Sequence, residues 1–286
     1  MTDQKTALVT GSNGFLGRHT VEVLEAAGWR VLSSGRSQLE GRPLDVHLDI
    51  SSPSNVMRSL DNVEFDAIIH LAARIGWPDK TETELFVPNV LATGCLAEIA
   101  RERRAKLVVA SAAIIHGVRN TSITSASPET ADTPYGRSKL LGDKLVQASG
   151  AAHCIIRFGG LFGLNGPAHL GLNKAISGIL QGEPPVIVGT GTARRNYLYV
   201  KDAAKSVDVV LKHDIEGVHL YAGREALPIG AMLQTACDVL ESGLKPERRD
   251  GGEAADQIIE PSTALPPSRS FEEALRDIRI EHLRCA

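Results

Sequence analysis

The sequence has no excess of positive charge. Its 286 residues include 31 Lys and Arg against 34 Asp and Glu, which gives a net charge of −3. A nucleic-acid backbone is bound through a basic face of the protein. Nucleic acid is therefore not an expected partner.

Long apolar runs are also lacking. No run reaches the roughly 18 to 20 residues that span a bilayer, and the first residues enter a strand pattern without the apolar core of a signal peptide. We expect a cytoplasmic protein with no membrane contact.

Cysteine is scarce as well. The four cysteines, Cys95, Cys154, Cys237 and Cys285, lie far apart in sequence and form no CxxC pair. Zinc sites and the disulfide frameworks of secreted domains both need closely organised cysteines. We expect reduced, structural cysteines and no metal site.

The sequence does have an alternation of short β-branched runs and longer helical stretches up to about residue 160. This alternation predicts a parallel sheet built from βαβ units. The expected strands are Ala7–Thr10, Arg30–Ser34, Asp45–Leu48, Ala67–Leu71, Lys106–Ala110 and Cys154–Phe158. The expected helices between them include Gly14–Ala27 and Glu82–Arg104.

Beyond residue 160 glycine and proline become frequent and the alternation weakens. We predict a Rossmann-type, doubly wound α/β domain over residues 1–160 and a smaller substrate-binding lobe over residues 161–286, with some crossing of the chain between the two. The Ser-, Thr- and Pro-rich stretch 119–134 is expected to be a surface loop that helps to shape a site.

A glycine-rich turn follows the first expected strand. Glycines at a spacing of three between a strand and a helix allow a tight turn, the close approach of a pyrophosphate, and a helix packed against the strand. The pattern therefore predicts a dinucleotide site. The residues expected to bind the cofactor here are Gly11, Asn13, Gly14, Phe15, Leu16 and Gly17.

The end of the second strand bears on the choice of dinucleotide. Gly35 stands where NAD-binding sheets carry an acidic residue, and Arg36 follows it. A guanidinium can bind a 2′-phosphate through paired hydrogen bonds, which favours NADP over NAD. Arg36 could instead be a surface arginine that stacks on the adenine. Asp49 could either bind the adenine amino group or cap the helix that starts near Pro53.

Tyr135 and Lys139 are the candidates for proton transfer. They open a helix at a separation of four residues, which places the phenol and the ammonium on one face. Because a nearby cation stabilises a phenolate, we expect Lys139 to lower the pKa of Tyr135 and to make it a usable acid and base.

With these motifs the chain resembles the extended short-chain dehydrogenase/reductase family, the NAD-dependent epimerases, dehydratases and reductases of nucleotide sugars. The resemblance covers nearly the whole chain. It is carried by TGSNGFLG, LDIS, HLAA, SAAIIHG, YGRSK, RFGGLFGLNGP and GTARRNYLYVKDAA.

The resemblance implies roles for further residues. It makes Tyr135 the catalytic acid/base and lets Lys139 also bind the nicotinamide ribose. Further cofactor contacts are expected from Asp49, Ile50, Leu71, Ala72, Ala73 and Asn89. Substrate contacts are expected from Arg195, which would hold a nucleotide diphosphate beside Arg194, and from Asn173 and Ser125. Such relatives commonly form homodimers through two helices, here 82–104 and 135–147.

The chain also departs from the family pattern. Ala112 stands where the family usually has a catalytic Ser or Thr. That hydroxyl is missing, displaced to Ser111, or supplied by Thr124 or Ser125. Ser111 can replace Ala112 only if the backbone turns, because adjacent strand residues face opposite ways. His116 replaces the usual tyrosine, which suggests packing.

The expected function is that of an oxidoreductase or epimerase that acts on a carbonyl or secondary alcohol of a nucleotide-linked sugar. A hydride would pass to or from the nicotinamide while Tyr135 handles the proton of the oxygen. Sugar 4,6-dehydration is disfavoured because Ala113 and Ile114 replace the dehydratase Asp-Glu pair. The alternative is a dinucleotide sensor without catalysis.

Overall fold

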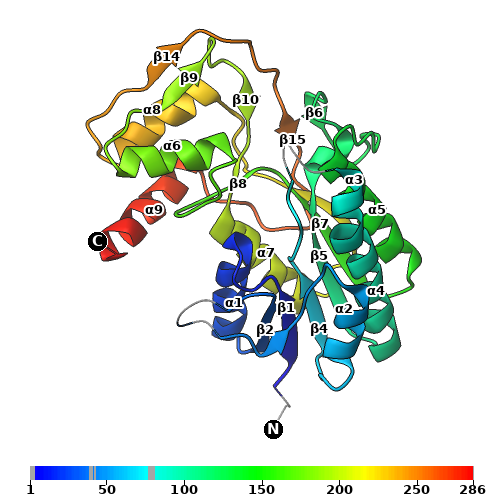
Figure 1. Cartoon of the computed structure of the whole chain (residues 1–286). Coiled ribbons are helices and arrows are strands. Elements are labelled where there is room, and N and C mark those ends of the chain that lie inside the picture. Colours follow the sequence, from blue (N-terminus) through cyan, green and yellow to red (C-terminus); the bar gives the residue numbers. More distant parts are fainter. Residues whose placement is uncertain (1–3, 39–40, 42, 77–80, 286) are drawn as a thin grey trace. The chain divides into compact units, whose positions relative to one another are not determined.

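The structure is a computed structural model that describes residues 4–38, 41, 43–76, 81–285 of the chain (Figure 1). The chain forms two compact units. The first contains residues 1–118, 128–157 and 204–219, and the second contains residues 119–127, 158–203 and 220–286. Both units are therefore built from separate stretches of sequence. Residues 119–127 precede the boundary expected near residue 160 but belong to the second unit, and residues 204–219 follow it but belong to the first.

The first unit is built on a seven-stranded sheet in the order β12-β7-β5-β4-β1-β2-β3. The pairs β1–β2, β2–β3, β1–β4 and β4–β5 are all parallel. Strand order reverses between β1 and β4, as in dinucleotide-binding folds. The strands are β1 (Thr6–Thr10), β2 (Arg30–Gly35), β3 (Val46–His47), β4 (Ala67–His70), β5 (Lys106–Ala112), β7 (His153–Phe158) and β12 (Gly217–Tyr221). The predicted Rossmann-type α/β fold is confirmed.

Helices cover both faces of this sheet. The helices α2 (Pro53–Leu60), α4 (Ala92–Arg103) and α5 (Pro134–Ala148) pack side by side on one face, and α1 (Phe15–Ala26) lies on the other (Figure 1). The core beneath the first group joins strand residues such as Leu8 and Ile68 to helix residues such as Leu96. The strands β1 and β4 are buried on both faces, which explains why they read as continuous apolar runs.

The second unit contains three helices and short strand pairs among its described residues. The helices are α6 (Gly171–Leu180), α8 (Ile229–Val239) and α9 (Phe271–Cys285). The strand pairs are β8 (Leu161–Phe162) with β11 (Leu198–Tyr199), β9 (Val186–Val188) with β14 (Glu247–Arg249), β10 (Arg194–Arg195) with β13 (Leu227–Pro228), and β6 (Ser122–Ile123) with β15 (Ile258–Ile259). Helix α7 (Val200–Lys212) starts in this unit and continues into the first.

Two expected elements differ in detail from the structure. The helix expected over residues 82–104 contains α3 (Glu82–Phe86), a π-helical turn η1 (Val87–Leu91) and then α4. Pro88 lies in this turn and has no N–H to donate to a regular helix ladder. The expected loop 119–134 includes the short strand β6, which is paired through the backbone with β15.

No helix among the described residues is both long and apolar enough to cross a bilayer. Cys95, Cys154 and Cys237 are free thiols, and the side chain of Cys285 lies outside the described part of the chain.

Candidate active site

The glycine turn joins β1 to α1. Gly11 has a φ of +69°, in the left-handed region that favours glycine, and a Cβ there would lie 2.9 Å from the Ala72 backbone. A Cβ on Gly17 would lie 2.1 Å from the Gly11 carbonyl oxygen, so any side chain would push α1 away from the turn. The exposed Gly14 is the N-cap of α1, and no side chain caps the helix there.

This geometry fits the phosphates of a dinucleotide. An uncapped helix start with bare glycine backbone leaves room and dipole for an anion. Asn13 ties the turn to the end of β2, because its Nδ2 donates to Ser37 O at 3.2 Å. Phe15 and Leu16, in the first turn of α1, are partly exposed. All the predicted contact residues of this turn therefore lie together.

A buried hydrogen-bond chain holds the adjacent turn after β4. Thr93 Oγ1 donates to Asn89 O at 2.8 Å, so it must accept from His70 Nε2 at 3.0 Å. His70 Nδ1 then accepts from Thr10 Oγ1 at 2.8 Å, and that oxygen accepts from Ala72 N at 3.2 Å. Burial lowers the pKa of His70 to about 3, so its ring is neutral, as this chain requires.

Asn89 connects the same turn to helix α5. Its Oδ1 accepts from Arg74 N at 2.8 Å, and its Nδ2 donates to Arg74 O at 2.9 Å and to Ser138 Oγ at 3.0 Å. Ser138 Oγ in turn donates to Tyr135 O at 2.8 Å. The Asn89 amide thus holds the backbone of Arg74, next to Leu71–Ala73. The expected contact of Asn89 with the cofactor stays a prediction.

Helix α5 carries Tyr135 and Lys139 in its first two turns. Its start is well defined, because Thr133 Oγ1 accepts from Gly136 N at 3.0 Å and Pro134 occupies the first helical position. Tyr135 is half-buried, whereas Lys139 is 3% exposed. The pair therefore has a fixed helical separation, with Tyr135 less deeply buried as a residue than Lys139.

The pKa of Tyr135 differs from the expectation. Burial, with a smaller effect of Asp143, raises it to about 12, whereas we expected Lys139 to lower it. Burial also lowers the pKa of Lys139, and the Asp143 carboxylate opposes that effect. The pKa differs because the sequence shows the cation one turn away, but shows neither the desolvation of the phenol nor the burial of the Asp143 carboxylate.

The position of Ser111 does not favour it as a simple replacement for the catalytic serine of the family. Ala112 is partly exposed in an extended conformation, with φ −138° and ψ 137°. Ser111 is 5% exposed, and it lies beside Asp143, whose pKa is raised by burial against the opposing effects of Lys139, Arg157 and Ser111. The strand thus does not turn so as to put Ser111 in the place of Ala112.

The two residues expected near the adenosine lie beyond β2 and β3. Arg36 is exposed, and its charge contributes to a lowered pKa of Asp49 after the larger effects of the Ser51 hydrogen bonds. Asp49 is not the N-cap of α2. Ser52 is, because its Oγ accepts from Asn55 N at 3.3 Å. The capping interpretation of Asp49 is therefore wrong, and the adenine contact of Asp49 stays a prediction.

The expected substrate residues belong to the second unit. Asn173 is 2% exposed. Its side-chain amide accepts a hydrogen bond from Gly163 N and donates one to Leu161 O, so it holds the turn after β8. Arg195 Nη1 donates to Ala255 O at 2.5 Å. Ser125 is exposed on the loop that contains β6. Contact of these three residues with a substrate stays a prediction.

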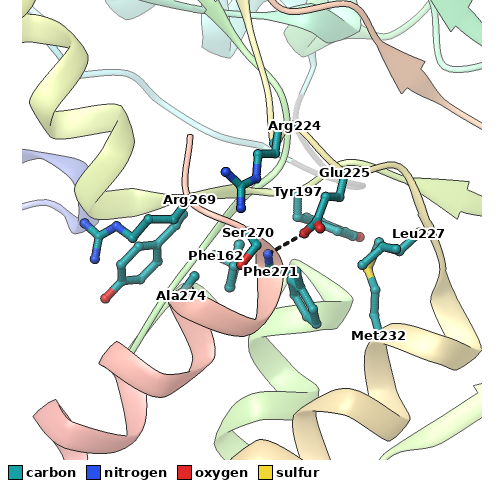
Figure 2. A pocket seen from close by; sticks show the side chains of 12 residues that line it. Phe162, Tyr197, Arg224, Glu225, Leu227, Met232, Arg269, Ser270, Phe271 and Ala274 are labelled. Carbon is teal, nitrogen blue, oxygen red and sulfur yellow. Dashed lines mark hydrogen bonds between the residues drawn. The ribbon is translucent and has the colours of Figure 1, made fainter. Parts of the chain in front are cut away.

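The second unit also has a small cavity of its own (Figure 2). Its volume of about 10 Å³ holds roughly one water. Arg269 packs over the Tyr199 ring there, 4.8 Å from the centroid, and Phe271 N donates to Glu225 Oε2 at 2.7 Å. The cavity cannot hold a sugar, and none of the predicted site residues lines it.

Sequence reasoning missed a buried charged cluster next to the Tyr135–Lys139 pair. Asp143 is 1% exposed and Arg157 is 5% exposed, and Arg157 Nε donates to Asp143 Oδ2 at 3.0 Å. One signal was available, since residues 135, 139 and 143 recur every four positions on one helical face. His116 lies in the same cluster and accepts from Arg157 Nη1 at 3.5 Å.

Comparison with known proteins places these features in a family. The sequence model of the NAD dependent epimerase/dehydratase family matches residues 7–223. A curated relative, a UDP-glucose 4-epimerase of Azospirillum brasilense, is 30% identical over an alignment of 249 residues that covers 74% of this chain and 71% of the relative.

Solved structures share the fold over the full chain. The UDP-N-acetylglucosamine 4-epimerase of Bacillus cereus has a TM-score of 0.84 at 22% identity and covers 98% of this chain and 100% of its own. MoeE5, solved in complex with UDP-glucose and NAD, has a TM-score of 0.81 at 25% identity and covers 98% of this chain and 99% of its own.

Proposed function

The chain belongs to the NAD dependent epimerase/dehydratase family, and we propose that it epimerises a UDP-linked hexose at a ring carbon, with Tyr135 as the acid/base. The observation that carries this proposal is the position of Tyr135 and Lys139 at the capped start of α5, tied through Ser138 and Asn89 to the turn after β4. The similarity to a UDP-glucose 4-epimerase supports the substrate class.

The residues present fit a nicotinamide dinucleotide. The glycine turn would hold its phosphates, Leu71–Ala73 would pass along it, and Lys139 would hold the nicotinamide ribose. When bound, the cofactor supplies the hydride chemistry. The chain itself binds and orients the sugar, and Tyr135 takes the proton of the hydroxyl or returns it to the ketone. Since the pKa of Tyr135 is raised to about 12, the phenol is protonated at neutral pH, and it must lose this proton before it can accept the proton of the sugar hydroxyl.

Single-turnover transfer of a hydride tests the role of Tyr135. We expect the wild type to interconvert a UDP-hexose pair and Tyr135→Phe to lose about 10²- to 10⁴-fold in rate, the usual contribution of a general acid/base. The affinity of Tyr135→Phe for the sugar nucleotide, measured by calorimetry, should remain that of the wild type. A wild type that binds the dinucleotide yet turns over no keto-sugar or hexose nucleotide would favour the sensor alternative.

Net reduction of a keto-sugar with NADPH is the second candidate. Gly35 followed by the exposed Arg36 favours it, because reduction consumes NADPH and the guanidinium suits a 2′-phosphate. We expect Arg36→Ala to weaken NADPH about tenfold or more and NADH little, in a fluorescence titration. An equal loss for both cofactors would remove the 2′-phosphate argument and leave NAD as the partner of an epimerase.

We also propose that the active form is a homodimer. The faces of α3, η1 and α5 carry exposed apolar side chains, namely Phe86, Leu91, Leu141 and Leu145. Grouped apolar side chains of this kind mark a protein interface.

A further inference from the structure

The face of α5 that carries the proton-transfer pair continues one turn further to Asp143. Tyr135, Lys139 and Asp143 are spaced four residues apart, so their side chains follow one stripe of the helix. Lys139 and Asp143 are both almost completely buried. A buried lysine and a buried carboxylate one turn apart each determine whether the other carries a charge.

Arg157 fixes Asp143 from the neighbouring strand β7. Its Nε donates to Asp143 Oδ2 at 3.0 Å, and its Nη2 donates to Glu129 Oε1 at 2.6 Å. Lys144 binds the other oxygen of Glu129 at 2.5 Å and reaches solvent. The guanidinium is thus held at both ends, and it would stay paired with Glu129 if Asp143 were neutral.

The second oxygen of Asp143 is in a different position. Asp143 Oδ1 and Ser111 Oγ are the atoms of this cluster that are buried without a hydrogen-bond partner in the described part of the chain. Burial raises the pKa of the Asp143 carboxyl, and the nearby Lys139, Arg157 and Ser111 oppose this rise. A carboxylate held by Arg157 through one oxygen acts electrostatically on Lys139 and Tyr135, which lie on the same helical face.

The electrostatics act in one direction on both partners. The Asp143 carboxylate raises the pKa of Lys139 against the effect of burial, and it adds to the burial that raises the pKa of Tyr135. Asp143 faces Lys139 on its own helix, Ser111 on β5 and Arg157 on β7. The other titratable groups near these residues are His70 on β4, His116 in the 3₁₀ turn η2 (Ala113–His116) and Glu129.

We propose that Asp143 is a positioning residue that, clamped by Arg157, keeps Lys139 charged and sets the pH at which Tyr135 exchanges its proton. Its effect on turnover rests on the proposed function. Its effect on the titration of Tyr135 does not, because that titration takes place in the protein alone.

Tyrosinate absorbance tests the proposal without substrate. The Tyr135 signal is the tyrosinate absorbance at about pH 10.5 that a protein loses when Tyr135→Phe is introduced into it. We expect Asp143→Asn to increase this signal about eightfold, which corresponds to a fall of about one unit in the pKa of Tyr135 from about 12. Asp143→Glu keeps the carboxylate and should keep the wild-type signal.

Asp202→Asn is the matched control. Asp202 is also a buried carboxylate that binds an arginine, with Oδ1 2.8 Å from Arg269 Nε, but it belongs to the second unit. We expect it to lower the melting temperature without changing the Tyr135 signal. Should Asp143→Asn not fold, Asp143→Ser leaves room for a water on Arg157 and should show the same increase.

The pH dependence of kcat/KM gives the second measurement. We expect Asp143→Asn to shift the whole profile to lower pH, because both pKa values fall. An unchanged Tyr135 signal in a folded Asp143 variant would overturn the proposal whatever the turnover is. A shifted signal in a protein without turnover would leave the proposal standing and remove the proposed enzymatic function.

Discussion

At the scale of single residues, the missing hydroxyl at position 112 has the clearest consequence. Ala112 is partly exposed, whereas Ser111 is buried beside Asp143. We therefore expect Ser111→Ala to cost less than about fivefold in kcat, compared with the 10²- to 10³-fold that loss of a hydrogen-bond donor to the reacting oxygen costs. Ala112→Ser should raise kcat, because it adds a hydroxyl at the exposed position.

Steady-state kinetics with the substrate found for the wild type measure both variants. A loss of 10²-fold or more in Ser111→Ala, with an unchanged Tyr135 titration, would show that Ser111 itself serves the substrate oxygen, as first expected from the sequence. A gain in Ala112→Ser alone would leave Ser111 as a neighbour of Asp143.

Residue chemistry was predictable where local spacing decides it. The glycines at 11, 14 and 17 and the pair at 135 and 139 need only the strand-turn-helix pattern and the helical repeat to be placed. The pKa of Tyr135 was not predictable, because it depends on burial and on Asp143, which only the packed fold defines. Asp49 was a candidate N-cap of α2, whereas the N-cap is Ser52, three residues later. Helix boundaries inferred from sequence are not accurate enough to separate these two residues.

At the scale of elements, the β1–α1 turn makes a sharp prediction. A Cβ on Gly17 would lie 2.1 Å from Gly11 O, so Gly17→Ala must displace the start of α1. We expect a loss of about 1–3 kcal/mol of stability and about tenfold or more in dinucleotide affinity. Urea unfolding and a cofactor titration measure the two effects.

Gly171→Ala is the control for this change. Gly171, like Gly17, lies at the start of a helix, here α6, but a Cβ on Gly171 would meet nothing within 4 Å. We expect it to be neutral or slightly stabilising, since alanine favours the helix. Equal effects of the two substitutions would mean that close packing at Gly17 is not what the turn requires.

The elements themselves were mostly predictable, and their irregularities were not. Six expected strands lie in the central sheet, with ends that differ by at most two residues. The π-helical turn over 87–91 was missed, although Pro88, which has no N–H for a regular helix ladder, is visible in the sequence; the contacts of Asn89 with Arg74 and Ser138 in this turn link residues distant in sequence. The strand β6 was missed because two residues become a strand only through their partner β15.

At the scale of the whole molecule, the exposed apolar side chains on the first unit predict self-association. Leu141 and Leu145 on α5 are 47% and 40% exposed, and Phe86 and Leu91 are 42% and 38% exposed on the α3 and η1 segments that contact α5. A patch used twice around a twofold axis would bury all of these at once.

Sedimentation velocity of the wild type and of Leu141→Asp with Leu145→Asp tests this association. We expect a dimer for the wild type and a monomer for the double variant, because a charge in the centre of an apolar interface is costly to bury. Met57→Asp is the control, since Met57 is 38% exposed on α2 of the same unit and lies outside the patch. A wild type that stays monomeric at tens of micromolar would contradict the predicted association, and a dimer that Met57→Asp alone dissolves would assign the contact to a different face.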